Sequence, residues 1–415
     1  MIPLQEGVDV EPVRRIPSVM LALLRIGLAA MASLAATWAE AAVPAAARTC
    51  EAADWTVGGA GVEHPRADCA AGPVLNAGSY REVWRRDYDG LLEFPPSYAG
   101  GVLYTAMDNG WVTAQRTTGS VVWSRRFTTP WPHGPRDAHY NAIVHTPTYW
   151  NGRLYFQTKN MGRIWCLDAA TGKTIWKFVN IGGEAAPIVI PTRRGPRVYA
   201  VEREGRVVVL DALTGEPIWA KQMLGHTTSA LAYSDRRLFG ADYDGNVIAF
   251  KRNGNVVWRR HLAFSSSYAN MAVRYGRLYA VSRLGWAFSL GTGAGRVRWK
   301  TRTTGITYGH PAVADGHVYT ESIDGTFWKL SAWTGKVEWA THHTRAIGGP
   351  VVLGRRVYFS EMGRRGRPGR VIGYNVGTMR QVFWWPDGKY SPVVAAGRTL
   401  VVVGLRKLYA LRPVL

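Results

Sequence analysis

The sequence predicts an all-β protein, an eight-bladed β-propeller, because one tryptophan and two glycines recur in a repeat of about forty residues. The tryptophan stands at the same place in six segments, at Trp123, Trp176, Trp219, Trp258, Trp299 and Trp339. A glycine lies four residues before each, at Gly119, Gly172, Gly215, Gly254, Gly295 and Gly335. A second glycine lies thirteen or fourteen residues before each, at Gly110, Gly162, Gly205, Gly245, Gly285 and Gly325. Two spacings kept in six copies indicate a structural repeat.

The unit from His310 to Trp339 shows how one repeat is expected to fold. Its sequence, HPAVADGHVYTESIDGTFWKLSAWTGKVEW, holds four short alternating stretches separated by Asp315-Gly316, Asp324-Gly325 and Thr334-Gly335. Glycine at these places permits the positive φ of tight hairpin turns. Four short antiparallel strands in about forty residues form the blade of a propeller. No long helical period interrupts this pattern between residues 80 and 415.

The number of blades follows from the first strands, which are expected to begin near Pro96, Pro147, Pro187, Leu231, Met271, Pro311, Pro350 and Pro392. The last unit has only three strands. The segment REVWRRDY, residues 81–88, is predicted to supply the fourth, with Trp84 at the repeated position. Such a strand closes the ring and removes two exposed strand edges. Because Phe383 and Met379 replace the tryptophan and glycine in the unit around 350–390, seven blades is the alternative if that unit is an irregular insertion.

The repeated tryptophans are predicted to be structural. Each follows a tight turn on the outermost strand, where its ring can fill the wedge between neighbouring blades. An indole buries on the order of 150–250 Å², so each seam gains several kcal/mol at about 25 cal/mol per Å². The alternative, a platform for stacking carbohydrate, requires exposed rings. The predicted docking residues are Trp84, Trp123, Trp176, Trp219, Trp258, Trp299 and Trp339.

Residues 1–47 are predicted to be an export signal. Arg14 and Arg15 precede an apolar stretch whose uninterrupted part, 26–36, has the length of a signal-peptide core. Small residues at 39–41 and 45–47 offer cleavage sites, and an uncleaved membrane anchor over 16–38 is the alternative. Either interpretation puts the rest of the chain outside the cytoplasm, whether periplasmic, secreted or anchored with the chain facing outward.

The cysteines agree with an oxidising compartment. Residues 48–79 form a glycine-rich linker in which Cys50 and Cys69 are expected to pair as a disulfide. Such a bond would contribute about 3 kcal/mol through loop closure. Cys166 is expected to be a small buried hydrophobic residue. The residues before Cys50 lack the small apolar pattern that lipidation requires.

The formal charge of +22 favours anionic partners, such as phospholipid head groups or anionic cell-wall polymers. A solvated surface rich in arginine is the alternative explanation of this charge. No nucleic-acid-binding arm or module signature is present, so nucleic acid is not expected as a partner.

Two long segments are the candidate partner-binding sites, because long loops on a rigid scaffold commonly carry binding residues. Residues 127–147 join the first two blades, and residues 361–370 form an expanded turn rich in arginine. Both are expected on the face that carries the connections between blades. Aromatic residues beside arginines are typical of interaction hot spots. The candidate partner-binding residues are Trp131, His133, Arg136, His139, Tyr140, Arg364, Arg365 and Arg367, with Arg370 in the same turn.

Metal binding is a weaker interpretation of the same loop. His133, His139 and His145, with Asp137, offer nitrogen and oxygen ligands but not in a known zinc spacing. His342 and His343 are neighbours on one strand, so their side chains point to opposite faces and joint ligation is not expected. Asp108, Asp244 and Asp324 stand in turns, where aspartate favours turn geometry.

The segments LDAATGKTIW (167–176) and LDALTGEPIW (210–219) resemble the tryptophan-docking motif of the pyrroloquinoline-quinone-like (PQQ-like) propeller superfamily. Degenerate copies are SAWTGKVEW, GAGRVRW and NGNVVW, and the resemblance covers about residues 80–415. The superfamily holds both quinoprotein dehydrogenases and non-catalytic scaffolds, so the motif predicts the fold and leaves the function open.

The scaffold branch, whose BamB-like members are exported eight-bladed propellers of similar length, is the better match. The enzyme branch implies two adjacent cysteines, acidic and amide ligands for calcium and an aspartate base. No Cys-Cys pair occurs, and the scattered candidates Glu202, Asn270 and Glu321 stand in no matching motif. We therefore expect an exported monomeric scaffold, without catalytic residues, cofactor or metal, that binds an envelope protein or an anionic polymer or lipid surface. The alternative is an oxidoreductase that depends on PQQ and calcium.

Overall fold

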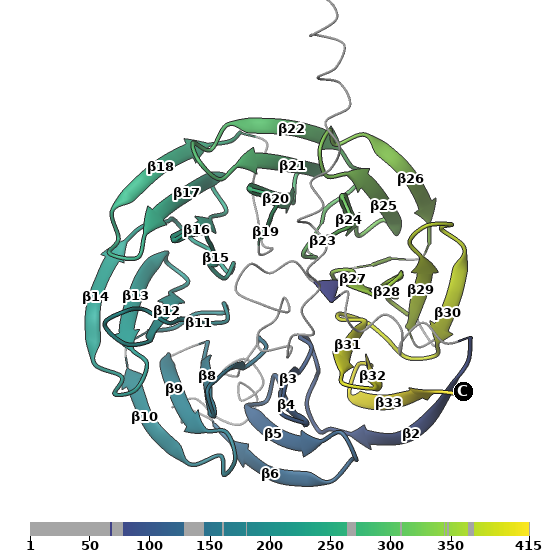
Figure 1. Ribbon diagram of the computed structural model, residues 1–415, viewed down its shortest axis with the longest axis horizontal. Coiled ribbons are helices and arrows are strands. Elements are labelled where there is room, and N and C mark those ends of the chain that lie inside the picture. The colour runs from purple at the N-terminus through teal and green to yellow at the C-terminus, as the bar shows by residue number, and fades with distance from the viewer. Residues whose placement is uncertain are drawn as a thin grey trace, which may run out of the picture. The chain divides into compact units, whose positions relative to one another are not determined.

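The computed structural model describes residues 78–127, 145–159, 162–179, 181–263, 271–307, 309–343, 345–346, 348–363 and 369–414, together with the backbone of 67–68. Its regular elements over these ranges are all β-strands. They form eight sheets arranged in a ring (Figure 1), within the compact unit from Cys50 to Leu415. Over the same ranges, no helix is long and apolar enough to cross a membrane.

The first four blades follow one another along the chain, each with its strands in sequence order from the axis outward. Blade 1 comprises β3 (Ser97–Ala99), β4 (Val102–Ala106), β5 (Trp111–Arg116) and β6 (Val121–Arg126). Blade 2 comprises β7 (Thr148–Trp150), β8 (Arg153–Gln157), β9 (Arg163–Asp168) and β10 (Thr174–Val179). Blade 3 comprises β11 (Ile188–Ile190), β12 (Arg197–Val201), β13 (Arg206–Asp211) and β14 (Pro217–Gln222). Blade 4 comprises β15 (Ala232–Ser234), β16 (Arg237–Ala241), β17 (Asn246–Lys251) and β18 (Val256–His261).

The other four blades complete the ring. Blade 5 comprises β19 (Ala272–Arg274), β20 (Arg277–Ser282), β21 (Trp286–Gly291) and β22 (Val297–Arg302). Blade 6 comprises β23 (Ala312–Ala314), β24 (His317–Glu321), β25 (Thr326–Ser331) and β26 (Val337–His342). Blade 7 comprises β27 (Val351–Leu353), β28 (Arg356–Glu361), β29 (Arg370–Asn375) and β30 (Gln381–Trp385). Blade 8 comprises β31 (Val393–Ala396), β32 (Thr399–Val403), β33 (Lys407–Pro413) and β2 (Tyr80–Asp87).

The eight-bladed prediction is confirmed, and the seven-bladed alternative is wrong because β27 to β30 form a complete antiparallel blade. Every first strand begins one residue after the predicted position. The middle strands of each blade are largely buried because both of their faces pack on neighbouring blades, whereas outer strands such as β6 bury mainly the repeated tryptophan. The core therefore lies between the blades.

The predicted clasp is present. β2 pairs antiparallel with β33, from Tyr80 opposite Pro413 to Asp87 opposite Lys407. The first described long strand thus becomes the outermost strand of the last blade (Figure 1). One element was not expected: the two-residue strand β1 (Ala67–Asp68), within the segment assigned to a linker, pairs parallel with the inner strand β27. The predicted signal region and Cys50–Cys69 lie outside the described residues.

The Thr-Gly turn of the repeat has a local cause. In blade 2, Asp168 Oδ1 accepts hydrogen bonds from the backbone N–H of Thr171 at 2.8 Å and from its hydroxyl at 2.7 Å. The hydrogen bond from the Thr171 side chain lowers the pKa of Asp168. The next residue, Gly172, has φ of 67°, in the left-handed region that glycine tolerates best. The Asp-x-x-Thr-Gly pattern is therefore a self-contained turn.

Each regular tryptophan docks on the turn of the following blade. Trp176 Nε1 donates to the carbonyl of Ala212 at 3.0 Å, and Trp258 Nε1 donates to that of Thr292 at 2.9 Å. These two rings are only 9% and 7% exposed, which excludes a stacking platform there. The same Nε1-to-carbonyl bond is made by Trp84, Trp123, Trp219 and Trp299. The structural role predicted for these rings is confirmed.

The glycine of the turn leaves the space in which the indole ring packs. A Cβ added to Gly215 would lie 2.6 Å from Cδ2 of Trp176. Gly152 has a nearly equal φ, 77° against 79°, but a Cβ there would meet nothing within 4 Å. We expect Gly152→Ala to cost about 1 kcal/mol of unfolding free energy through backbone strain alone. Gly215→Ala should cost more than about 3 kcal/mol, because the indole is displaced as well. Denaturant unfolding of both variants checks this; equal losses would contradict the docking role of Gly215.

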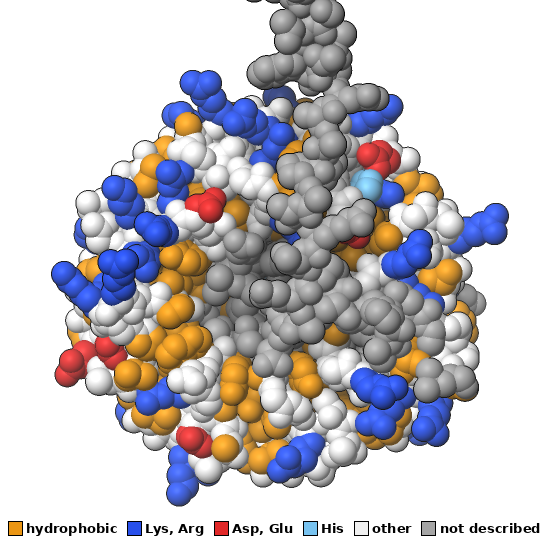
Figure 2. Space-filling model, in the orientation of Figure 1, with side chains coloured by type: hydrophobic (Ala, Val, Ile, Leu, Met, Phe, Trp, Pro, Cys, Tyr) orange, Lys and Arg blue, Asp and Glu red, His pale blue; other side chains and the backbone are white. Residues whose placement is uncertain are grey.

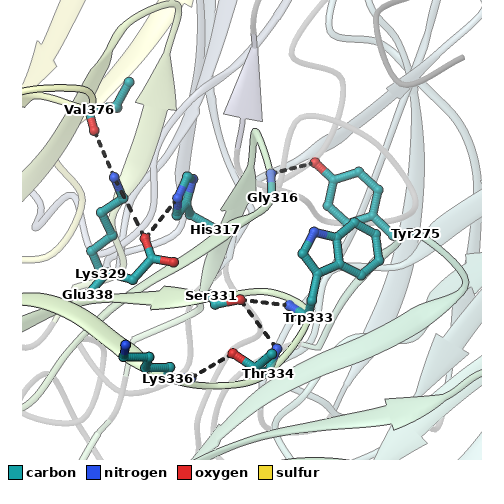
Figure 3. Close-up of polar contacts among 10 residues, drawn as sticks. All are labelled: Tyr275, Gly316, His317, Lys329, Ser331, Trp333, Thr334, Lys336, Glu338 and Val376. Atoms are coloured by element: carbon teal, nitrogen blue, oxygen red, sulfur yellow. Dashed lines mark hydrogen bonds and ion pairs between the residues drawn. The ribbon is translucent and has the colours of Figure 1, made fainter. Parts of the chain in front are cut away.

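The seam between blades 6 and 7 departs from the rule. Met379 replaces the glycine and adopts φ of 50°, so its side chain occupies the turn on which Trp339 would dock. Figure 3 shows the substitute: Lys329 Nζ donates to the Val376 carbonyl at 3.0 Å. Trp339 instead packs on the ring of Tyr374, with centroids 5.2 Å apart. Trp339 therefore packs in the seam, as predicted for the repeated ring, but the hydrogen bond to the turn carbonyl is made by Lys329 instead.

The loss of tryptophan at Phe383 has a different cause. The outer pair of blade 8 consists of two chain segments, β33 and β2, rather than a hairpin. Blade 8 therefore has no turn between its third and fourth strands, and an indole N–H on β30 would find no turn carbonyl. Phe383 needs only to pack, and it contacts Tyr80 edge-on at 5.6 Å.

Candidate functional site

One face of the ring carries both the turns between second and third strands and the connections from one blade to the next, because the strands are antiparallel. We call it the connection face. The other face carries the turns between first and second and between third and fourth strands, and we call it the turn face. The described ends of the two long candidate loops, 127–147 and 361–370, lie on the connection face.

Most of the predicted partner-binding residues lie outside the described residues: Trp131, His133, Arg136, His139, Tyr140, Arg364, Arg365 and Arg367. Their placement stays a prediction. The structure does describe the ends of both loops, at His145 and at Arg370. Both of these side chains are committed to contacts within the fold, as shown below.

His145 is a buried structural residue. Its Nδ1 lies 3.0 Å from the Thr146 carbonyl oxygen, and its Nε2 lies 3.0 Å from the carbonyl oxygen and 3.2 Å from the backbone nitrogen of Gln157. Burial lowers the pKa of His145 to about 4, so the ring is neutral near pH 7. Because both nitrogens are occupied, the predicted zinc set of His133, His139, His145 and Asp137 loses His145, and that alternative is wrong in the form stated.

Opposite charges meet near blades 1 and 2 on the connection face. Lys159 Nζ lies 3.1 Å from Glu184 Oε1. Burial, and then the carboxylate of Asp108, raises the pKa of Glu93. Asp108 accepts the backbone N–H of Leu91 at 2.7 Å, so its carboxylate holds the connection between β2 and β3 in place. These groups come from turns and connections that are far apart in sequence.

A second polar group lies on blades 3 and 4. Arg203 Nε donates to His226 Nε2 at 3.0 Å, and His226 Nδ1 lies 3.6 Å from the exposed carboxylate of Glu204. The His226 ring also packs on Tyr243, with centroids 5.0 Å apart. The Tyr243 hydroxyl lies 2.8 Å from that of Thr228. This group offers a cation, an imidazole and a phenol at one place on the surface.

A third group joins blades 6 and 7. The side chain of Glu361, 2% exposed, lies 3.0 Å from His343 Nδ1 and forms an ion pair with Arg370. His343 Nε2 lies 2.7 Å from the Tyr374 hydroxyl. Burial opposes the charge of Glu361, but the hydrogen bonds from His343 and Arg370 outweigh it and lower its pKa to about 2. His342, in contrast, is exposed and lies 3.3 Å from Thr326 Oγ1.

Replacing Glu361 by glutamine tests this group. A pKa lowered from 4.5 to about 2 corresponds to a stabilisation of about 3 kcal/mol. We expect Glu361→Gln to lose most of it at pH 7. In the parent protein this contribution is present above pH 4.5 and is lost as the pH falls toward about 2. Urea unfolding between pH 7 and pH 3 measures it, and Glu204→Gln, at an exposed carboxylate, is the matched control. Equal losses in both variants would contradict the assignment.

The connection face shows no site for a metal ion among the described residues, where no three His, Cys, Asp or Glu side chains converge. The candidate metal ligands named from the sequence make other contacts where the structure describes them. Glu202 pairs with Arg206 in its own hairpin, and Glu321 is 1% exposed within blade 6. Asp324 is a turn residue, because its Oδ1 accepts the N–H of Thr326 at 2.9 Å. Asn270 lies outside the described residues.

The chain matches the model of the family described as outer membrane protein assembly factor BamB over residues 73–193, 160–274 and 243–382. The chain belongs to this family. The match spans most of the propeller and confirms the PQQ-like repeat. Among curated proteins, the dehydrogenase subunit of a quinone alcohol dehydrogenase from Gluconobacter oxydans is 32% identical over 113 residues, 26% of this chain. The corresponding subunit from Gluconacetobacter polyoxogenes is 31% identical over the same length. The chain spans only 15% of the length of these relatives.

Solved structures of both branches share the fold with this BamB-family chain. A europium-containing methanol dehydrogenase superposes with a TM-score of 0.71 at 14% identity, over 87% of this chain and 98% of that one. BamB from Moraxella catarrhalis superposes with a TM-score of 0.53 at 16% identity, over 68% and 97%. At these identities the likeness shows the fold alone.

The three polar groups of the connection face were not predicted from the sequence. Their members are single residues of ordinary type, such as Lys159, Arg203 and Glu361, without a motif around them. One signal could have found them. Aligning the eight repeats places Asp108, Lys159, Arg203 and Tyr243 at the same turn position, and places Glu93, Glu184, Thr228 and Lys389 four residues before the first strands. Variable polar residues at fixed positions of a repeat mark its display surface.

Proposed function

We propose that this protein is an exported, non-catalytic scaffold that binds a protein partner at the cell envelope through its connection face. Membership of the BamB family supports this proposal, and so does the charge of +22. Figure 2 shows basic side chains at intervals around the ring and few acidic ones. A surface of this kind suits an acidic partner surface.

The main support for the proposal is the set of contacts that the polar groups of the connection face make. Lys159 pairs with Glu184, Arg203 with His226, and Glu361 with His343 and Arg370. Charged and polar groups that these contacts fix on rigid turns give a patterned surface for recognition. No three metal-ligating side chains converge among them in the part of the chain that the structure describes.

Affinity capture from an envelope extract tests the proposal. The bait is the chain without residues 1–47, and the test variant is Arg203→Glu with Arg345→Glu, two positions on the connection face. The control is Arg116→Glu with Arg380→Glu, two exposed residues on the turn face, one at the end of β5 and one just before β30. We expect a captured protein that the test variant loses and the control keeps. Capture that only the control variant loses would refute the assignment to the connection face.

The alternative is an oxidoreductase of the quinone-dependent type, and the identity of 32% to an alcohol dehydrogenase subunit favours it. The residues do not fit that chemistry well. The chain has three cysteines, at 50, 69 and 166, so no adjacent pair exists, and the described residues hold no metal-ligand cluster. Titrating the purified chain with PQQ and calcium, and then assaying oxidation of alcohols with a dye acceptor, separates the two. Tight binding with turnover would replace the scaffold proposal by this one.

A further inference from the structure

A pocket on the turn face, between blades 3 and 4, is lined by five arginines. Its volume is about 710 Å³. The wall is formed by Pro191, Thr192, Arg193, Arg194, Arg197, Arg236, Arg252 and Asn253. No acidic residue lines it. This pocket lies on the opposite face from the proposed partner surface.

Two departures from the repeat create the pocket. The turn between β11 and β12 covers six residues, 191–196, whereas the equivalent turn of blade 4 covers only Asp235 and Arg236. The turn between β17 and β18 is one residue shorter than that of blade 3, since Lys251 precedes Trp258 by seven residues and Asp211 precedes Trp219 by eight. A long turn on one side of the seam and a short one on the other leave open space between them.

The short turn also changes how the seam is held. In regular seams an arginine at the start of the second strand holds two carbonyls of the next turn: Arg153 Nη1 contacts those of Ala212 and Leu213, at 3.3 and 2.9 Å. Arg237 and Arg277 make the same pair of bonds. Among the described residues Arg197, at the equivalent position, makes no such pair. Its Nε is buried without a hydrogen-bond partner there.

None of the five arginines forms an ion pair with a carboxylate in the described part of the chain. Asp211 of blade 3, whose Oδ2 would lie 3.8 Å from a Cβ added to Gly195, holds its own turn by accepting the N–H of Leu213 at 2.8 Å. Several guanidinium groups around one pocket offer many N–H donors to the same ligand. This arrangement binds phosphate oxygens well.

We propose that this pocket binds a phosphate-bearing anion, either a soluble phosphate ester or diphosphate or the head group of an anionic phospholipid. A phosphate offers three or more acceptor oxygens and more than one negative charge, so it matches several guanidiniums at once better than a single carboxylate does. The buried Nε of Arg197 and the exposed side chains of Arg193 and Arg194 supply donors from the wall and the rim.

Calorimetric titration of the purified chain with pyrophosphate, at constant ionic strength, tests the proposal. The test variant is Arg193→Gln with Arg194→Gln, whose side chains make no contact that holds the fold. The control, Arg116→Gln with Arg380→Gln, removes the same charge from the same face, on blades 1 and 7. We expect the dissociation constant of the test variant to rise at least about tenfold and that of the control to change less than about twofold. Equal thermal unfolding of both variants confirms that they fold.

Sedimentation with vesicles identifies the source of the phosphate. Binding to phosphatidylglycerol vesicles, lost in the test variant and competed by pyrophosphate, assigns a lipid head group. Binding of pyrophosphate without vesicle binding assigns a soluble anion. Three results overturn the proposal. The first is that neither pyrophosphate nor vesicles bind, and the second is that the test and control variants weaken binding equally. The third is that an acidic peptide, and not pyrophosphate, displaces the bound vesicles, which would assign the pocket to a protein segment.

Discussion

Replacing Trp258 by alanine is expected to lower the free energy of unfolding by about 3–5 kcal/mol. The ring is 7% exposed and lies across the seam between blades 4 and 5. Its loss leaves a cavity and also removes the hydrogen bond from Nε1 to the Thr292 carbonyl. Because a closed ring has no free end at which a loosened seam can separate alone, the whole propeller should unfold at a lower denaturant concentration. Urea unfolding followed by tryptophan fluorescence measures the change.

Trp384→Ala is the matched control for this experiment. Trp384 follows directly after the docking position of blade 7, and its ring is 60% exposed. Removing it deletes the same atoms without opening a cavity, so the loss should stay below about 1 kcal/mol. A similar loss in both variants would mean that the indole contributes through the unfolded state and not through the seam.

Removing the clasp is the second change with a large expected effect. A chain that begins at Tyr88 lacks β2, which pairs with β33 over its whole length and carries Trp84. The edge of β33 is then exposed, and Gly119 of blade 1 loses the ring that covers it. Exposed strand edges pair with other chains. We expect the shortened chain to associate and to lose its cooperative thermal transition, as shown by light scattering and calorimetry.

A chain that begins at Gly78 is the control, because it keeps β2 and loses only the residues before it. It should remain monomeric and unfold cooperatively, with at most a small loss from the two-residue strand β1. If the chain beginning at Tyr88 unfolds like this control, blade 8 is stable with three strands and the clasp does not close the ring.

The fold could be predicted from the sequence because its determinants are local and repeated. The turn at Asp168, Thr171 and Gly172 forms through contacts among these residues themselves. The tryptophan that follows it packs on the equivalent turn of the next blade. The same logic explains the exceptions only once the structure is known. Met379 could be recognised in the sequence as a departure from the repeat. The hydrogen bond from Lys329 to the Val376 carbonyl could not be predicted, because its two residues lie on different blades that meet only in the folded structure.

The candidate site could be predicted only in part. The two long loops were predicted as binding sites from their length, and their candidate partner-binding residues, apart from Arg370, lie outside the described residues. The three polar groups and the arginine pocket arise from residues such as Arg197 and Arg252, which lie on different blades. Their contact depends on how turns of unequal length face each other across a seam, and no single segment of the sequence encodes it.

Site-specific photocrosslinking in intact cells tests the central functional claim most directly. A photoreactive amino acid is placed at Arg203 or Arg345 on the connection face, and at Arg116 or Asn253 on the turn face. We expect the first pair alone to give a crosslinked product with an envelope protein. Crosslinks to an envelope protein from the turn face alone, or none from either face in a protein that oxidises alcohols with PQQ, would contradict the account.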